Sequence, residues 1–388
     1  MKQIIEYLRQ IKEKGLYREL KYLEAAQGPY TVVEGKKVLL MASNNYLGLC
    51  NDERLKKAAM RTIEAYGVGA GGSRLTTGSY RLHKELEEKI AQFKGTESAL
   101  VFNTGYMANV GTIAGIADKN WVIYSDELNH ASIIDGCRLS RAKIVVYRHC
   151  DASNLLKKAR QFQGAPGLIV TDGVFSMDGD IAPLEDIVEI AKRYSCLVMV
   201  DDAHATGVLG PNGAGTADYF GLKDEIDIQM GTLSKALASE GGYVAGKKYL
   251  IDYLRHRARS FIYSTALAPA TVAVSLASLD IVRKEPELRK RLLENARWFQ
   301  KQLISLGFKV MESKTAIIPI IIGDADKAVQ FSKRLFEAGI YIPAIRPPTV
   351  PRGTSRLRVT LMATHTKDDL NYALEKIKKV GQRLGIIK

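Results

Sequence analysis

The chain has 388 residues, 46% of them hydrophobic and 25% charged, which predicts a globular protein with a sizeable core in one or two domains. The net charge of +14 is high, but the densest basic group, at 255–259, is short and lacks interleaved aromatic residues, which argues against nucleic-acid binding. Four scattered cysteines, no signal-peptide pattern and no long apolar run argue against disulfides, a zinc site and a transmembrane helix, and predict a cytoplasmic protein.

The N-terminal part of the chain predicts two helices around a short strand. Residues 1–20 carry apolar side chains at helical spacing, so we expect an amphipathic helix lying on the body of the protein. A strand at 38–41 and a helix at 52–66 follow. The next segment, 67–72, matches the pattern G-x-G-x-x-G, but a helix precedes it where a dinucleotide-binding fingerprint requires a strand. We therefore interpret it as a flexible glycine-rich loop near a binding site, and we do not expect it to bind NAD.

The middle of the chain repeats short apolar runs separated by helical patterns. The runs are 99–102, 121–124, 144–147, 168–171, 197–200, 226–230 and 243–245. Strands that alternate with helices predict an α/β protein with a mainly parallel sheet covered on both faces. Ligands bind such sheets at the carboxyl ends of the strands.

The C-terminal part predicts a compact α+β domain. A long charged helix at 283–306 leads into it, and a strand at 356–361 alternates apolar and polar residues. Thr366 and Asp369 predict a capping box at the start of the last helix. We expect an N-terminal helix and arm, a large cofactor-binding domain and a small C-terminal domain, with the bounds 1–45, 46–282 and 283–388.

One lysine stands in a loop of small and hydroxylic residues. Lys235 follows the apolar run 226–230, with Thr232 and Ser234 close before it. A lysine among neutral neighbours loses hydration and shifts towards its neutral, nucleophilic form. We therefore predict that Lys235 holds pyridoxal phosphate as a Schiff base. The hydroxyls of Thr232 and Ser234 would donate hydrogen bonds to its phosphate. The alternative is an ordinary solvated lysine.

Other strand ends carry groups that a pyridine cofactor needs. Asp201 follows the run 197–200, and a carboxylate there could keep a proton on the ring nitrogen. The alternative is a solvated strand-end aspartate. His130 follows the run 121–124 and could stack on a flat ring, although taken alone the residue favours the alternative, a histidine satisfied by packing.

Two further strand ends complete the predicted site. Ser176 offers a hydroxyl in a tight turn after 168–171. Gly105 follows 99–102 at a predicted helix start, where free backbone N–H groups could receive a phosphate. Each signal is weak alone, and their common position at one edge of the sheet predicts a single site.

With these residues in view, the sequence closely resembles the α-oxoamine synthases, pyridoxal-phosphate enzymes of fold type I. The resemblance spans nearly the whole chain, and its most specific pieces are 43–49, 201–204 and 232–236. Members of the family join an amino acid to an acyl thioester with loss of carbon dioxide. The resemblance thus implies the fold type I architecture, a mainly parallel seven-stranded sheet with a smaller α+β domain.

The resemblance also assigns roles to individual residues. Lys235 would bind the cofactor and move the Cα proton, with Asp201 on the pyridine nitrogen, His204 and Ser176 beside the phenolic oxygen, and His130 stacked on the ring. The phosphate contacts would be Gly105, Tyr106, Thr232 and, from the neighbouring subunit of a homodimer with shared active sites, Thr265. The substrate-side positions would be Arg18, Asn44, Arg346, Thr349 and Arg358, of which Arg358 would bind the amino acid carboxylate.

The signals for the acyl substrate point to two different branches of the family. The segment 344–351 resembles the branch that condenses L-alanine with a pimeloyl thioester, of coenzyme A or acyl carrier protein, in biotin biosynthesis. Asp172 and the segment 129–136 resemble instead the branch that joins glycine to acetyl-CoA. Ala238 stands where the family frequently has glycine. A non-catalytic pyridoxal-phosphate-binding regulator would need an added DNA-binding domain, for which this length leaves no room.

Overall fold

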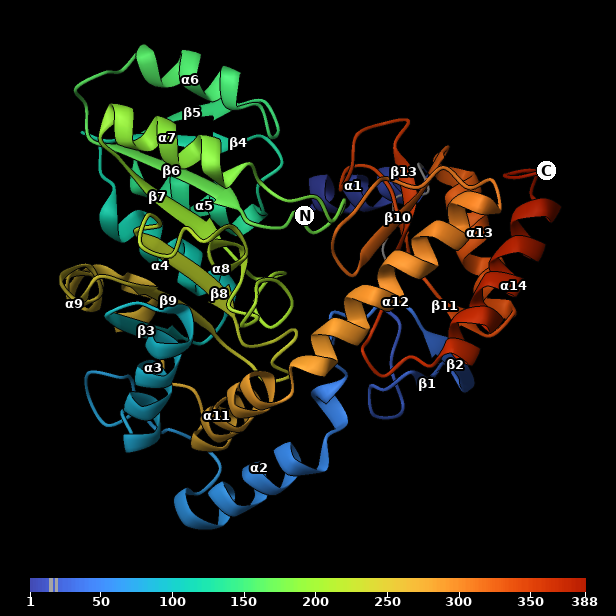
Figure 1. Ribbon diagram of the computed structural model, residues 1–388, viewed down its shortest axis with the longest axis horizontal. Helices are drawn as coiled ribbons and strands as arrows, with labels where there is room; N and C mark the ends of the chain where they lie inside the picture. Colours follow the sequence, from blue (N-terminus) through green and yellow to red (C-terminus); the bar gives the residue numbers. More distant parts are fainter. Residues whose placement is uncertain (14–16, 18–19) are drawn as a thin grey trace.

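The computed structural model describes residues 1–13, 17 and 20–388, and it has two lobes joined by the long helix α12 (Pro286–Ser305) (Figure 1). The larger lobe contains a seven-stranded sheet with the order β3-β9-β8-β7-β6-β4-β5. Only β9 runs antiparallel to its neighbours. The predicted seven-stranded, mainly parallel sheet is therefore confirmed.

Each strand of this sheet overlaps one of the predicted apolar runs. The strands are β3 (Ser98–Phe102), β4 (Val122–Asp126), β5 (Lys143–Tyr147), β6 (Gly167–Asp172), β7 (Cys196–Asp201), β8 (Ile228–Thr232) and β9 (Gly242–Gly246). Every residue of β6 and β8 is buried. Because helices cover both faces, these two strands are buried along their whole length and do not alternate between buried and exposed residues.

Helices pack on the two faces of the large sheet, as Figure 1 shows. One face carries α4 (Gly105–Ile116), α5 (Ala131–Ser140), α9 (Lys248–Arg257) and α10 (Arg259–Ile262). The other carries α3 (Arg81–Lys94), α6 (Ala152–Arg160), α7 (Leu184–Tyr194), α8 (Thr216–Phe220) and α11 (Pro269–Lys284), with α2 (Glu53–Tyr66) packed against α11. The parallel strands of the sheet therefore end together at one edge, between the two helical layers.

The smaller lobe contains two three-stranded sheets. One comprises β10 (Ile317–Gly323), β13 (Ser355–Thr360) and β12 (Ala344–Ile345), and the other β1 (Tyr30–Val33), β2 (Lys36–Leu40) and β11 (Ile340–Tyr341). Helices α13 (Ala325–Glu337) and α14 (Lys367–Arg383) complete it. The N-terminal strands thus share a sheet with the C-terminal lobe, while the division at 46 and 283 stays a prediction.

Local signals explain how several helices begin and end. Thr366 Oγ1 accepts from the Asp369 N–H at 3.1 Å and the Asp369 carboxylate accepts from the Thr366 N–H at 2.8 Å, which confirms the capping box before α14. The predicted helix 283–306 is wrong at its start, since Arg283 belongs to α11 and α12 begins at Pro286. Proline lacks the N–H that would continue the preceding helix.

The N-terminal helix forms, but it does not lie on the body as expected. None of the residues of α1 (Lys2–Glu13) is buried, and Ile4, Ile5 and Tyr7 are exposed. The glycine-rich segment 67–72 is a loop, as predicted, and its Gly72 carbonyl accepts from the Ala266 N–H at 2.9 Å. No helix among the described residues has the length and apolar character needed to cross a membrane.

Candidate active site

The carboxyl ends of the central strands surround a cavity of about 210 Å³. The start of α4, the start of α5 and the ends of β6, β7 and β8 all contribute to its walls. The predicted residues that line it are Gly105, Tyr106, His130, Asp201, His204, Thr232 and Lys235. The fold therefore brings most of the predicted cofactor residues to one place.

Lys235 reaches the cavity from the loop after β8. The loop is held in a turn, in which the Ala238 N–H donates to the Lys235 carbonyl at 3.0 Å. Burial lowers the pKa of the Lys235 amine, although the nearby carboxylates of Asp201 and Asp172 act in the opposite direction. The lowered pKa increases the neutral, nucleophilic fraction of this amine.

Asp201 is the last residue of β7 and is 3% exposed. Its carboxylate accepts from the Asn109 amide at 2.7 Å and from the Ala203 N–H at 2.8 Å. Among the described residues it has no ion pair, and both of these donors are neutral. A buried carboxylate with neutral partners can bind a protonated ring nitrogen that enters the cavity.

A second carboxyl group, Asp172, lies in the same cavity and was absent from the predicted site. Burial, with the charge of Asp201, raises its pKa well above the usual value. Its carboxyl oxygen accepts from the His130 N–H at 2.7 Å and so fixes the segment that carries the imidazole. Asp172 ends β6 as Asp201 ends β7, a signal by which the sequence could have indicated it.

The two histidines of the cavity are both held in their neutral form. His130 begins α5, and its Nδ1 lies 2.7 Å from the Ser132 hydroxyl. His204 Nδ1 lies 2.7 Å from the hydroxyl of Tyr46, a residue the sequence analysis did not single out. Burial lowers the pKa of both imidazoles. Neutral rings can stack on a planar group or share a hydrogen bond without adding charge.

The opposite end of the cavity is suited to a phosphate. Thr104 caps α4 by accepting from the Met107 N–H at 3.1 Å, which leaves the first N–H groups of the helix available. Gly105 comes so close to Thr232 that an added Cβ would lie 3.4 Å from the threonine Cβ. The Thr232 hydroxyl, 2.8 Å from that of Ser234, adds polar groups beside this helix N-terminus.

This donor set fits pyridoxal phosphate. The Lys235 amine would hold its aldehyde, the buried Asp201 carboxylate would pair with its ring nitrogen, and the N-terminus of α4 with the neighbouring hydroxyls would bind its phosphate.

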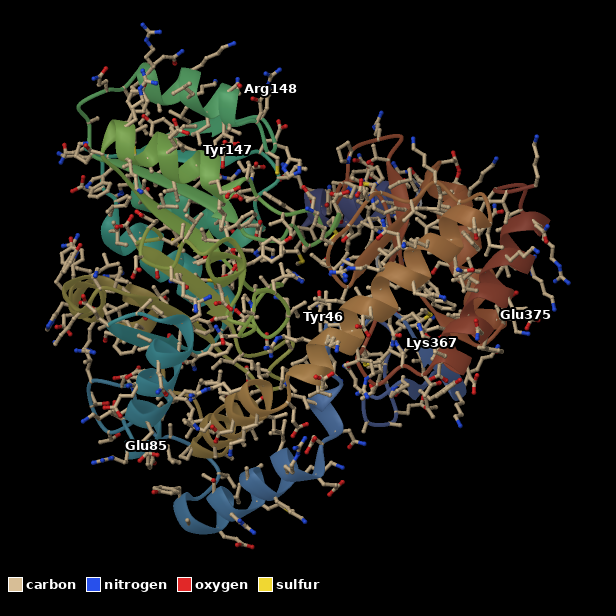
Figure 2. The ribbon with its side chains drawn as sticks, in the orientation of Figure 1. Tyr46, Glu85, Tyr147, Arg148, Lys367 and Glu375 are labelled. Atoms are coloured by element: carbon tan, nitrogen blue, oxygen red, sulfur yellow. The ribbon has the colours of Figure 1, made fainter. Side chains whose placement is uncertain are left out.

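Arg358 connects the small lobe to this site. It lies on β13, is 7% exposed, and its Nη2 donates to Asn44 Oδ1 at 3.2 Å and lies 3.4 Å from the Tyr46 hydroxyl. Its Nε donates to the Ser176 carbonyl. Figure 2 shows Tyr46 at the junction of the two lobes. The predicted alternation of this strand is correct, but its polar face is buried too, because it packs against the large lobe.

Some predicted residues lie outside the cavity. Ser176 and Thr349 line a neighbouring pocket, and Asn44 lines a shallow hollow next to Ser234. Thr265 is exposed, and Arg346 lies in the partly buried loop before Thr349. Arg18 falls outside the described residues.

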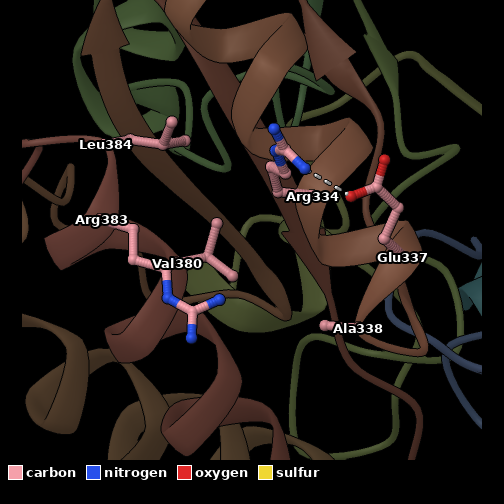
Figure 3. A pocket seen from close by; sticks show the side chains of 6 residues that line it. All are labelled: Arg334, Glu337, Ala338, Val380, Arg383 and Leu384. Carbon is pink, nitrogen blue, oxygen red and sulfur yellow. Dashed lines mark hydrogen bonds and ion pairs between the residues drawn. The ribbon is translucent and has the colours of Figure 1, made fainter.

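A further hollow, of about 500 Å³, lies between α13 and α14 (Figure 3). It is lined by Arg334, Glu337 and Arg383, of which Arg334 and Glu337 form an ion pair at 3.0 Å. It shares no residue with the cavity at the strand ends.

The chain is similar to proteins of known class along its whole length. Residues 36–377 match the family described as aminotransferase class I and II. An 8-amino-7-oxononanoate synthase of Lysinibacillus sphaericus is 55% identical over 98% of each chain, and one of Thermoanaerobacter pseudethanolicus is 51% identical over 99% of this chain and 98% of the relative. A serine palmitoyltransferase from S. paucimobilis, solved with pyridoxal phosphate and myriocin bound, has 34% identity and a TM-score of 0.94, covering 99% of this chain and 98% of its own.

Proposed function

The chain belongs to the α-oxoamine synthase family of pyridoxal-phosphate enzymes, and on this basis we propose that it is an 8-amino-7-oxononanoate synthase. The enzyme joins L-alanine to a pimeloyl thioester, of coenzyme A or acyl carrier protein, and releases carbon dioxide and the free thiol. The observation that carries the proposal is the full-length identity of 50% and above to proteins of that name.

Arg358 is the residue we assign to the amino acid carboxylate. Its guanidinium is buried beside Ser176 and Asn44, and the described residues give it no carboxylate partner. A guanidinium binds a carboxylate through two parallel hydrogen bonds, which fixes the orientation of the substrate. An amino acid bound in this way would present its Cα to the cavity that Lys235 lines.

Pyridoxal phosphate, when bound, supplies an aldehyde that takes the amino acid nitrogen and a ring that accepts electrons from Cα. Asp201 would hold the proton on the ring nitrogen, and the His130 ring would stack on the cofactor and exclude water. Lys235 takes the proton from Cα and later returns one. Overall, the reaction forms a bond between the acyl carbonyl carbon and Cα, releases the thiol, and replaces the carboxylate of alanine, lost as carbon dioxide, with a proton.

The active form is proposed to be a cytoplasmic homodimer. Thr265 is exposed, and its carbonyl accepts from the Asn103 amide at 2.7 Å beside the start of α4. An exposed threonine placed there is suited to reach the phosphate of a second subunit. Glycine with acetyl-CoA remains the second candidate substrate pair, because Asp172 and the segment 129–136 favour it.

The decisive experiment is a product assay of the holoenzyme with alanine or glycine against pimeloyl-CoA or acetyl-CoA. Alanine with pimeloyl-CoA should give the highest kcat/KM and 8-amino-7-oxononanoate, identified by mass spectrometry. Lys235→Ala, which removes the only amine in the cavity among the described residues, is the control and should give no product. A preference for glycine with acetyl-CoA would replace the proposal with the second candidate.

A further inference from the structure

A second pocket, of about 440 Å³, lies where the two lobes meet next to the catalytic cavity. We refer to it as the interlobe pocket. The loop after β6 lines one side with Phe175 and Met177, and the small lobe lines the other with Met311, Ile321 and Val350. Polar and charged residues also line it, but most of the surface that faces the pocket is apolar, and both lobes are needed to form it. Such a pocket is suited to a flexible hydrocarbon chain.

The interlobe pocket adjoins the reacting groups through Ser176. Ser176 lines the pocket, and its carbonyl accepts from the guanidinium of Arg358. Arg356 and Arg358 are two positions apart on β13 and point to the same face of the strand. Arg356 lines the pocket, whereas Arg358 lies at the amino acid position. A substrate attached near Arg358 can therefore extend directly into the pocket.

Three cationic side chains line the interlobe pocket, and two of them are already neutralised. Arg356 is paired with Asp178. His149 lies between Asp126 at 3.0 Å and Asp180 at 2.7 Å. The third cation, Lys309, is exposed at the pocket rim, and no carboxylate of the described residues pairs with it. A ligand carboxylate that reaches this rim thus meets one uncompensated positive charge.

We propose that the interlobe pocket receives the methylene chain of the acyl substrate and that Lys309 binds its distal carboxylate. Lys309 is then the residue that selects a dicarboxylic acyl chain over a monocarboxylic one of equal length. This inference rests on the proposed function, because of the two candidate acyl groups, pimeloyl and acetyl, the pimeloyl group alone carries both the apolar chain and the terminal charge.

The test compares pimeloyl-CoA with heptanoyl-CoA, which has a methyl group in place of the distal carboxylate. Lys309→Met keeps the apolar stem and removes the charge, and it should lower kcat/KM for pimeloyl-CoA about five- to tenfold. The value for heptanoyl-CoA should stay within about twofold, because no ionic contact is lost. Lys301→Met, which removes an exposed charge of α12 outside the pocket, should alter neither value.

A second variant tests the pocket itself. Met311→Trp fills the space that the methylene chain would occupy, and it should lower kcat/KM for both acyl-CoA substrates at least tenfold. A titration with alanine, followed by the absorbance of the bound cofactor, should give the same curve as the wild type, which would show that the amino acid site is intact. Met60→Trp, at an exposed methionine of α2 outside the pocket, is the matched control and should retain turnover of both substrates.

The outcomes separate this inference from the proposed function. If the wild-type enzyme converts pimeloyl-CoA but Lys309→Met leaves the preference over heptanoyl-CoA unchanged, the role of Lys309 is wrong. Unchanged kcat/KM in Met311→Trp would place the acyl chain elsewhere. If the wild type gives no product with pimeloyl-CoA and alanine, the proposed function fails, and this inference fails with it.

Discussion

The hydroxyl of Tyr46 lies 2.7 Å from Nδ1 of His204, which joins the segment after β2 to the end of β7. The same hydroxyl lies 3.4 Å from the guanidinium of Arg358. One buried oxygen therefore connects a neutral imidazole of the cofactor cavity with the residue assigned to the amino acid carboxylate. This hydroxyl therefore links the two lobes beside the cavity.

Tyr46→Phe should weaken alanine binding without unfolding the protein. The variant leaves the buried Nδ1 of His204 without its partner and removes one of the three contacts of the Arg358 guanidinium, so kcat/KM for alanine should fall about tenfold. Steady-state kinetics with varied alanine measure this. Tyr30→Phe removes an exposed hydroxyl that bonds to Asp369, and it should leave kcat/KM unchanged. An equal loss in both variants would refute the positioning role of Tyr46.

Asp201→Asn should slow turnover by about 100-fold or more, since a neutral amide cannot hold a proton on the ring nitrogen. Cofactor binding should persist, because Lys235 and the phosphate end of the cavity are unchanged. Single-turnover kinetics and the absorbance of bound cofactor separate the two effects. Asp252→Asn, at an exposed pair on α9, controls for the change of charge. Turnover within tenfold of wild type would contradict the role of Asp201.

Lys94→Met should destabilise the large lobe by about 3–5 kcal/mol, because it leaves the buried carboxylate of Asp202 without its cation. The Lys94 amine lies 2.8 Å from that carboxylate, and neither side chain is more than 1% exposed. Denaturant unfolding of this variant and of a control measures the loss in free energy of unfolding. Lys56→Met, at an exposed pair with Glu53, should change stability by no more than about 0.5 kcal/mol. Similar small effects at both positions would exclude a structural role for the buried pair.

Ala238→Gly should stabilise the catalytic loop. Ala238 has φ of +52°, in the left-handed region that costs a residue with a Cβ about 1 kcal/mol. Glycine removes this strain, so the unfolding midpoint should rise. The contrasting variant is Ala236→Gly. Ala236 is buried and lies two positions earlier in the loop, and its replacement should lower the free energy of unfolding by about 0.5–1 kcal/mol. A lower midpoint for Ala238→Gly would show that the alanine side chain contributes more through packing than it costs in strain.

His149→Gln should show a pH-dependent loss of stability. Burial alone would lower the pKa of His149, but hydrogen bonds with Asp126 and Asp180, and the neighbouring Cys150, raise it to about 12. The stability that His149 contributes is thus complete below 6.5, the pKa of histidine in the unfolded chain, and it decreases as the pH rises towards 12. The difference in unfolding midpoint between wild type and variant should be larger at pH 6 than at pH 9. A constant difference would mean that His149 is not protonated in the folded protein.

The fold class followed from the sequence because its signals are local. Seven short apolar runs between helical patterns predicted a parallel sheet covered on both faces, and every run became a strand. The family resemblance and the cofactor were likewise confirmed by the comparisons. The break before Pro286 was missed because the charged pattern continues across it, although the proline itself was a visible signal.

The strand-end residues of the cavity were also predictable. His130, Asp201 and Lys235 each follow an apolar run, and parallel strands end at the same edge of a sheet. The repeating pattern alone therefore placed them together. Their roles on the cofactor stay predictions until the variants are measured.

Only the tertiary structure decided how the small lobe completes the site. Arg358 and Asn44 are 314 residues apart in sequence, and no period or motif relates them. Their contact, the link from Tyr46 to His204 and the apolar walls of the interlobe pocket all depend on the angle at which two separately packed lobes meet. Sequence patterns report which residues share a strand or a helix face, because those relations are local. The alignment of the lobes is set by the packing of whole surfaces, which no short stretch of the chain encodes.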